Sequence, residues 1–534
     1  MEPTVSQFSK LVPVWSATVL SMECSLLSIG STFDVDCEVK SVAMATLLQS
    51  PYLSSTDLLR RLIFLVIFSL PTAAQTVCPP TPAWSLCEIT FPSDHAPLQA
   101  EFRSPGHRTF LIHSFSDGQK QILRIVPTEP GTWDFRIDGK EGSFTATGSD
   151  APGYVEAANV HHFRYTGSKQ PHLWAGGINH VAVAADQSHD AEIVSLHKSG
   201  KTADLIIPPN ANLPELVARY GALNITWQVP PQPREIIDII KSLDQYQHLI
   251  DYRTYRSSNG DEVAIEHQTF PVPFVNYFSA GNPDADQFRK ALWQTTLDGA
   301  YPESQPPNDA AAAQLKHWYD FFAQTRHWEL EPFFDADGRH ALALEGVEYV
   351  VYVEQPGTVN VTVEKHNYDV AWFNPASGER IDLKNLKTEI FTGEPPDNKH
   401  DWVLHISREG QKAGMLKSYK FESREILQQE VEAVKVPYEI AEPTGDSLSL
   451  KAPGNFAVKL TKDTKAARAM RYLWTGEVSA DGQGLRVLGT GKQGQLVIPA
   501  DIAKRFPALL HLRVEGLNGV GKLYTLDRNY QLTP

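Results

Sequence analysis

A strand-like run that ends in an aromatic and an amide side chain is the first place in this sequence where chemistry could occur. The run LNITW, residues 223–227, is short and apolar, as buried strands are, and Gln228 follows it. A tryptophan at a strand tip can stack on the face of a sugar ring, and a glutamine can bind a hydroxyl group. Trp227 and Gln228 are therefore candidate substrate-binding residues, although a place in the core would explain Trp227 equally well.

Carboxylates, which could act as acids, bases or nucleophiles, are scarce around this strand. No Asp or Glu occurs from Gln228 to Pro233, and the next acid is Glu235. Glu235 begins a segment with helical spacing, so a residue stabilised by the helix dipole is the structural alternative. Glu266 stands before His267 in a strand-like segment and could line a cleft, whereas an ion pair with a nearby Arg or His is the structural alternative. Glu235 and Glu266 are the candidate catalytic residues.

Three histidines, His161, His162 and His267, raise the question of a metal site. Such a site needs three or more converging ligands. The sequence offers no HxxxH or HxH motif with a matching acid. We therefore predict no metal ion and no cofactor, and His267 is kept as a candidate substrate-binding residue.

Charge and motifs exclude other classes of function. The net charge is −15 at pH 7, so binding of nucleic acid through a general positive field is excluded. There is no GxSxG nucleophile elbow and no phosphate-binding P-loop, so esterase and nucleotide chemistry have no support. A neutral or weakly charged substrate fits better, and the oligomeric state is left open.

The elements that must position these residues change along the chain. Residues 76 to about 160 contain short β-rich runs punctuated by Gly, Pro and Asp, which predict a β-sandwich of Ig-like size. Residues 160–335 alternate apolar strands with helical patterns, which predict βα units around a parallel sheet or barrel. From residue 335 onward the chain is predicted to be β again.

Two helix starts and one strand are predicted within residues 160–335, close to the candidate site residues. One helix is predicted to open at Asp284 or Asp286, and another at Asn308 or Asp309. The segment IEHQTFPVPFVNYF, which contains Glu266, is predicted to be a strand with loops.

The first 75 residues contain a targeting pattern. Arg60 and Arg61 precede an apolar run at about 62–71, which is followed by the small residues Thr72, Ala73 and Ala74. This is the pattern of a secretory signal peptide, and the run is too short to span a bilayer comfortably. A start at Met44 would explain why the pattern lies so deep in the chain, and a buried core helix is the alternative left open. We predict a secreted or periplasmic protein with no membrane attachment after cleavage.

Two cysteines follow the predicted cleavage site. Cys78 and Cys87 are nine residues apart in a chain expected to be exported. A disulfide that fixes the start of the mature chain is therefore predicted. Zinc binding by this pair alone is not expected, because structural zinc needs four ligands.

Three segments together resemble a known family. FRSPGHRTFLIHSFSDGQKQILRIVPTEPGTWDFRIDGKEGSF resembles the Ig-like domain that precedes certain bacterial glycoside-hydrolase-like barrels. VHHFRYTGSKQPHLWAGG resembles the first strand of those barrels. VEKHNYDVAWFNPASGE, with DWVLHI after it, is similar to their C-terminal β-sandwich, which carries a collagen-binding label in that family. The resemblance is to the apiosidase-like and cellulase-like glycoside hydrolases, covers about residues 95–407, and implies the order sandwich, (β/α)8 barrel, sandwich.

The resemblance implies two carboxylates at barrel strand ends. One protonates the leaving oxygen while the other attacks or activates water. This sequence departs from that pattern, because no acid follows NITW before Glu235. The second acid is expected after PFVN, where Asn276 is followed by none before Asp284, and Asn276 is kept as a candidate substrate-binding residue. The barrel region, 170–335, is also short, at about 165 residues against roughly 250 for a complete barrel.

The predicted fold class is multidomain α/β plus all-β, with an Ig-like β-sandwich, a truncated (β/α)8-type barrel and C-terminal β-sandwich domains. The predicted boundaries are 1–75 (extension and signal peptide), 76–160 (Ig-like sandwich), 161–335 (glycoside-hydrolase-like barrel), 336–410 (β-sandwich of the collagen-binding type) and 411–534 (a further β-rich domain). The predicted function is that of an exported, glycoside-hydrolase-like protein acting on or binding a polysaccharide or oligosaccharide, with its expected catalytic carboxylates lost or displaced. The alternative is a non-catalytic carbohydrate- or matrix-binding protein derived from such an enzyme. Two carboxyl groups about 5–9.5 Å apart in one cleft would favour hydrolysis.

Overall fold

The computed structural model describes residues 77–534 apart from gaps, of which the longest are 256–262, 409–435, 479–485 and 499–507. Before residue 77 it describes only strands β1 (Cys24–Leu26) and β2 (Val35–Cys37), which pair antiparallel. The chain forms two compact units, Met1–Ala73 and Ala74–Pro534. The predicted signal segment and Met44 lie outside the described residues. None of the helices that are described is long and apolar enough to cross a bilayer.

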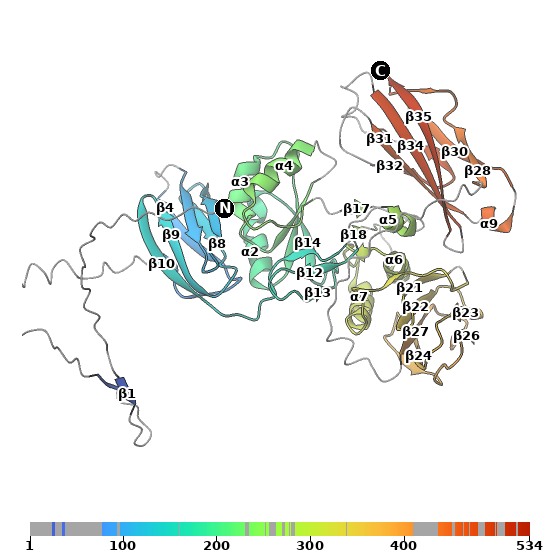
Figure 1. The fold of residues 1–534 in the computed structure, drawn as a ribbon, viewed down its shortest axis with the longest axis horizontal. Helices are drawn as coiled ribbons and strands as arrows, with labels where there is room; N and C mark the ends of the chain where they lie inside the picture. Colours follow the sequence, from blue (N-terminus) through green and yellow to red (C-terminus); the bar gives the residue numbers. More distant parts are fainter. Residues whose placement is uncertain are drawn as a thin grey trace, which may run out of the picture. The chain divides into compact units, whose positions relative to one another are not determined.

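The N-terminal part of the larger unit consists of two packed sheets, drawn in blue and cyan in Figure 1. One sheet has the order β3-β10-β9-β5-β6, and the other has the order β4-β8-β7. Trp133, Phe135 and Ile137 alternate with exposed residues along β9 and join a single apolar core. The strands are β3 (Thr81–Pro82), β4 (Cys87–Pro92), β5 (Gln99–Arg103), β6 (Thr109–His113), β7 (Phe115–Ser116), β8 (Lys120–Ile125), β9 (Gly131–Ile137) and β10 (Lys140–Thr147).

A disulfide joins Cys78 to Cys87 at the start of this sandwich, with both side chains in its core. Their sequence separation is 9, and closing so short a loop in the unfolded chain stabilises the fold by about 2–3 kcal/mol. We therefore expect the double variant Cys78→Ser with Cys87→Ser to lower the free energy of unfolding of the sandwich by that amount, measured from the urea midpoint. Adding reductant to the wild-type chain should give the same loss. A double variant with an unchanged midpoint would contradict the prediction.

Two three-stranded parallel sheets follow, each curled like part of a barrel, with the orders β14-β15-β16 and β17-β18-β19. Backbone hydrogen bonds connect the first sheet to the segment before β17, from Trp227 N–H to the Leu249 carbonyl (2.9 Å), and the segment before β14 to the second sheet, from Gly176 N–H to the Pro302 carbonyl (2.8 Å). A small antiparallel sheet, β11-β12-β13, precedes them. The strands are β11 (Val155–Ala157), β12 (Phe163–Tyr165), β13 (Pro171–His172), β14 (His180–Ala184), β15 (Thr202–Ile206), β16 (Ile225–Gln228), β17 (Arg253–Tyr255), β18 (Phe274–Asn276) and β19 (Tyr301–Pro302).

Helices cover the outer face of the first curled sheet (Figure 1). Ala203 and Leu205 of β15 belong to an apolar cluster that includes Ile193, Tyr220 and Ile240 from three of the helices. Residues of β15 that alternate with Ala203 and Leu205 therefore face the other way, into the interior of the curled sheets. The helical elements are η1 (Gln187–His189), α2 (Asp190–Lys198), α3 (Leu213–Tyr220), α4 (Arg234–Leu243), α5 (Val263–Thr269), α6 (Ala285–Leu297) and α7 (Asp309–Phe322).

Two predicted helix starts are confirmed, and one predicted strand is wrong. The side chain of Asp284 caps α6 by accepting a hydrogen bond from the backbone N–H of Gln287, and Asn308 caps α7 by accepting one from Ala311. The residues around Glu266, however, form helix α5 rather than a strand. A short apolar run can be a buried helix as well as a buried strand, because periodicity alone does not separate the two.

The next domain is a β-sandwich. Its six-stranded sheet has the order β20-β21-β22-β27-β24-β25, and strands β23 and β26 form a second layer. One face of the larger sheet packs on β23 and β26, and the other packs on α6 and α7, so every residue of β22 is buried. The strands are β20 (Glu331–Pro332), β21 (His340–Leu344), β22 (Glu348–Val353), β23 (Val359–Thr362), β24 (Tyr368–Phe373), β25 (Arg380–Asp382), β26 (Ile390–Gly393) and β27 (Trp402–Arg408).

The last part of the chain contains two further sheets, with the orders β28-β30-β33 and β29-β35-β34-β31-β32. They share an apolar core that includes Tyr472, Trp474 and Tyr530. The elements are β28 (Tyr438–Glu442), β29 (Ser447–Ser449), β30 (Asn455–Leu460), α9 (Lys465–Arg468), β31 (Arg471–Val478), β32 (Arg486–Thr490), β33 (Gln493–Gln495), β34 (Ala508–Leu517) and β35 (Leu523–Thr533).

Candidate functional site

Trp227 and Asn276, two of the candidate substrate-binding residues, point toward the helices. Trp227 is fully buried in the cluster under α2–α4, and its indole N–H donates to Asp244 Oδ2 at 2.9 Å. Of the two interpretations of Trp227, a sugar-stacking residue and a core residue, the structure agrees with the core residue, because the Trp227 side chain lies on the face of β16 that packs against the helices. Asn276 is also fully buried, and its amide donates to Thr295 Oγ1 of α6. Gln228 is half-buried at the end of β16, on the face that alternates with Trp227.

The two candidate catalytic acids lie on helices. Glu266 is 0% exposed in α5, so a substrate does not reach it without a rearrangement. Glu235 lies in α4, and its side chain is outside the described part of the chain. His267 follows Glu266 but contacts Glu331 of β20 through its imidazole (2.6 Å). The structure therefore does not bring Glu235 and Glu266 together with Gln228 or Asn276 in one described cleft.

Two acids that the sequence did not single out as catalytic, Asp204 and Glu303, lie side by side inside the curled sheets. Asp204 is the central residue of β15, and Glu303 directly follows β19. They are 0% and 1% exposed and hydrogen-bonded to each other. We call these two residues the buried carboxyl pair. Their approach depends on Gly176, because a Cβ there would lie 2.3 Å from the Glu303 backbone.

A chain of polar groups surrounds the buried carboxyl pair. Thr226 donates to Asp204 Oδ1 at 2.6 Å, and His180 Nδ1 donates to the same oxygen at 3.0 Å. His180 Nε2 then accepts from His172 Nε2 at 2.7 Å. Trp174 stacks on the His180 ring, with centroids 3.5 Å apart, and donates its indole N–H to Glu303 Oε2. Every hydrogen bond that reaches Asp204 from these neighbours suits an ionised carboxylate.

Burial controls the protonation of this network. Burial raises the pKa of Asp204 to about 8, and burial together with the charge of Asp204 raises the pKa of Glu303 well above its usual range. Burial also lowers the pKa of His172 and His180, so both rings stay neutral. At neutral pH the pair therefore keeps at least one proton, which fits best on Glu303 as the donor to Asp204. Raised carboxyl pKa values of this kind occur at active sites and also in structural networks.

A second polar cluster consists of His161, His162, His267 and Glu331, which we call the His–Glu cluster. His161 Nδ1 lies 2.9 Å and His267 Nε2 lies 2.6 Å from Glu331 Oε2, while His162 Nε2 lies 3.6 Å from Oε1. His161, His267 and Glu331 offer ligand atoms within 4.8 Å of one another, a spacing that could hold a metal ion. The sequence argument that no three ligands converge is therefore wrong, because the ligands come from separate segments and no short motif connects them.

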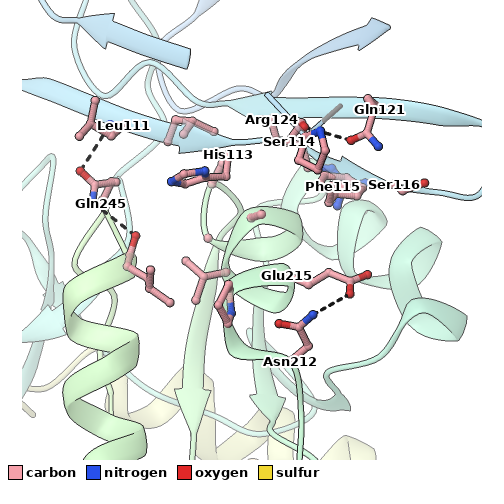
Figure 2. A pocket seen from close by; sticks show the side chains of 18 of the residues that line it. Leu111, His113, Ser114, Phe115, Ser116, Gln121, Arg124, Asn212, Glu215 and Gln245 are labelled. Atoms are coloured by element: carbon pink, nitrogen blue, oxygen red, sulfur yellow. Dashed lines mark hydrogen bonds between the residues drawn. The ribbon is translucent and has the colours of Figure 1, made fainter. Parts of the chain in front are cut away.

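A pocket of about 500 Å³ lies between the N-terminal sandwich and the helices α3 and α4 (Figure 2). Its polar lining includes His113, Asn212 and Gln245, and Figure 2 shows Gln245 accepting from the Leu111 N–H and Asn212 donating to Glu215. Glu215 is the one carboxylate in the lining of this pocket. The pocket can hydrogen-bond hydroxyl groups, but it lacks the second acid that glycosidic cleavage needs.

Comparisons with known proteins agree with this architecture. Residues 335–407 match the family model described as "Putative collagen-binding domain of a collagenase". A crystal structure described as a "putative glycoside hydrolase" from Bacteroides vulgatus is similar, with a TM-score of 0.51 and 14% identity over 62% of this chain and 100% of that one. A glycoside hydrolase family 5 structure from the same organism has a TM-score of 0.41 and 12% identity over 48% of this chain and 93% of that one. No curated protein matches this chain. The chain is glycoside-hydrolase-like in its fold.

Sequence reasoning missed Asp204, Glu303 and Glu331 for physical reasons. Asp204 is the middle residue of β15, whereas catalytic acids were expected directly after a strand. A polar residue between two buried apolar ones, Ala203 and Leu205, was the available signal. Glu303 directly follows the two-residue strand β19, and Glu331 lies in the two-residue strand β20. Strands this short show no alternation of apolar and polar residues from which a sequence could predict them.

Proposed function

We propose that this chain is an exported, glycoside-hydrolase-like protein that binds a neutral polysaccharide without cleaving it. We further infer that the curled sheets derive from a (β/α)8 barrel and that the N-terminal sandwich is Ig-like. Export rests on the basic and apolar pattern at 60–74. The apiosidase-like resemblance and the likeness in fold support a carbohydrate ligand, and the match at 335–407 leaves binding to a protein matrix as the competing ligand class.

The burial of the carboxyl pair is the observation that carries this proposal. A glycosidase needs two carboxyl groups that both reach the scissile bond. Within the described residues of the curled sheets, Asp204 and Glu303 form the close acid pair, and at 0% and 1% exposure they are closed to a polymer. Glu266, at 0% exposure, is closed as well. The pocket of Figure 2 has a mostly apolar lining with a few polar side chains and, among the described residues that line it, a single carboxylate, which supports binding rather than hydrolysis.

The test uses the mature chain from Gln75 in affinity electrophoresis on a panel of neutral plant polysaccharides, with a parallel assay for reducing sugar. We expect retention on at least one polysaccharide and no sugar release. The double variant His113→Ala with Gln245→Ala should bind about tenfold or more weakly, because two hydrogen bonds of about 1 kcal/mol are lost. His400→Ala is the matched control, since His400 is exposed and outside the pocket lining.

Three outcomes would contradict this proposal. Sugar release that disappears in Glu266→Gln would assign catalysis to Glu266 despite its burial. Equal retention of the wild-type chain and the pocket variant would show that the polysaccharide binds elsewhere. If the chain binds none of the polysaccharides but binds immobilised collagen, the matrix-binding alternative replaces the carbohydrate one.

A second candidate function, hydrolysis at the buried carboxyl pair, is favoured by one observation. Both carboxyl groups have raised pKa values, and Glu303 holds a proton that a general acid could donate. This function requires the interior of the curled sheets to open to a sugar chain. Reducing-sugar release that is lost in Glu303→Gln, but kept in Glu266→Gln, would establish it in place of the binding proposal.

A further inference from the structure

The hydrogen bonds around the His–Glu cluster fix which nitrogen of each ring carries a proton. His161 Nε2 lies 3.1 Å from the backbone carbonyl of His267, and His267 Nδ1 lies 3.0 Å from the carbonyl of Gly299. A carbonyl oxygen only accepts hydrogen bonds, so each of these nitrogens must donate. In a neutral imidazole the other nitrogen then carries a lone pair. Both lone pairs point at the carboxylate of Glu331.

This arrangement brings three electron-rich groups together. When both rings are neutral, the carboxylate of Glu331 and the facing nitrogens of His161 and His267 all act as acceptors, and they repel one another unless a proton or a metal cation lies between them. Placing a second proton on both rings would put two positive charges on stacked imidazoles whose centroids are 3.7 Å apart. A single divalent cation satisfies all three groups at once.

A third histidine, His162, lies beside Glu331 but is not part of the group whose ligand atoms lie within 4.8 Å of one another. His162 is 5% exposed, and its Nδ1 is hydrogen-bonded to Tyr301 Oη at 2.9 Å. Its Nε2 is buried without a hydrogen-bond partner among the described residues and lies 3.6 Å from Glu331 Oε1. An unpartnered buried nitrogen costs free energy unless something binds it. His162 can therefore supply a fourth ligand.

We propose that His161, His267 and Glu331, with His162 as the fourth ligand, form a binding site for a divalent transition metal of the zinc type. Two or three imidazoles and one carboxylate suit zinc, whereas calcium and magnesium prefer oxygen ligands. The carbonyls of His267 and Gly299 act as the outer partners that orient metal-binding histidines. Tetrahedral zinc needs donor atoms about 3.3 Å apart, so Glu331 has to retract slightly from its present contacts at 2.6 and 2.9 Å.

The position of the site indicates a structural role. His161 precedes β12, Gly299 precedes β19, and Glu331 lies in β20 of the C-terminal sandwich. The site is therefore at the N-terminal side of β19, whereas Glu303 follows its C-terminal side. In barrel proteins the N-terminal side of the strands serves stability rather than catalysis. A metal here would cross-link the segment before β12 to strand β20 of the six-stranded sheet. His161 and Glu331 are 170 residues apart in the sequence.

The test measures zinc binding and needs no substrate, so its outcome is independent of the proposed carbohydrate function. The mature chain is stripped with a chelator, dialysed against zinc chloride alone, and analysed for metal by mass spectrometry and for melting temperature. We expect about one zinc ion per chain and a rise in melting temperature of roughly 5 °C. Cobalt(II) in place of zinc should give the visible absorption of a tetrahedral site.

Glu331→Gln and His267→Asn are the test variants. Each keeps a hydrogen-bonding side chain of similar size but removes a ligand, so zinc affinity should fall by more than the roughly 10–100-fold that loss of an outer partner costs. His400→Ala is the control, because His400 and Asp397 form an exposed pair 2.8 Å apart, and the described residues offer this pair no third ligand. Less than about a tenth of a zinc ion per wild-type chain, with no shift in melting, would overturn the proposal. Stoichiometric zinc that both test variants retain, each folded by circular dichroism, would overturn it as well.

Discussion

Replacing Arg289 by methionine is expected to lower the free energy of unfolding by about 3–5 kcal/mol, because it leaves a buried carboxylate without its partner. Arg289 of α6 donates from Nε and Nη2 to both oxygens of Asp401, at 2.9 and 2.7 Å. Their side chains are 5% and 3% exposed, so water cannot replace the lost guanidinium. Tyr352 adds one hydrogen bond to Asp401, which does not neutralise its charge. Urea unfolding of the mature chain, followed by tryptophan fluorescence, measures the loss.

The neighbouring residue provides a control for this prediction. Lys290 pairs with Glu354 at 3.3 Å, but their side chains are 41% and 36% exposed, so Lys290→Met should change the stability by less than about 1 kcal/mol. Adding Asp401→Asn to Arg289→Met should restore part of the loss, because the amide oxygen can still accept from Tyr352 and carries no charge. A loss below about 1 kcal/mol in Arg289→Met would show that the ion pair contributes little to the attachment of α6 to the sandwich.

The sequence predicted the helix starts and the strands of the N-terminal sandwich, because both depend on residues that are close together in the chain. Asp284 and Asn308 are helix caps whose side chains bond to a backbone N–H three residues on, so the signal and the structure lie within one turn. The strands of the N-terminal sandwich alternate buried and exposed residues, and this alternation is readable in β9.

The polar clusters could not be predicted, because their members are far apart in the chain. Trp174 and Glu303 are 129 residues apart, and His161 and Glu331 are 170 apart. Pairing at such separations is set by the register of parallel strands and by close approaches such as that of Gly176 to Glu303. A search for acids directly after strands, guided by the family resemblance, found none, so Glu235 and Glu266 were taken as replacement candidates. Both lie on helices, so chain order alone was a poor guide to position.

The buried carboxyl pair should make the stability of the protein depend strongly on pH. In an unfolded chain Asp and Glu ionise near pH 4, whereas burial raises the pKa of Asp204 to about 8 and that of Glu303 well above its usual range. Between about pH 4 and 8 the folded chain therefore binds more protons than the unfolded chain. Stability is then greatest at the acid end of this window and falls as the pH rises, by about 1.4 kcal/mol per pH unit for each proton.

Glu303→Gln is expected to flatten this decline between pH 6.5 and 8, where the wild-type chain should lose about 2 kcal/mol for one proton. The amide has no proton to release, its oxygen can accept from Trp174, and its NH2 group can donate to Asp204, so the packing is kept. Urea midpoints at four pH values in this range measure how the stability of the wild-type chain and that of Glu303→Gln change with pH. Glu156→Gln is the control, because salt bridges from Arg164 and Lys169 offset its burial and lower its pKa, so it titrates below this range. A decline in Glu303→Gln as steep as that of the wild type would mean that Glu303 does not carry the proton responsible for it, and it would remove the general acid that hydrolysis at this site requires.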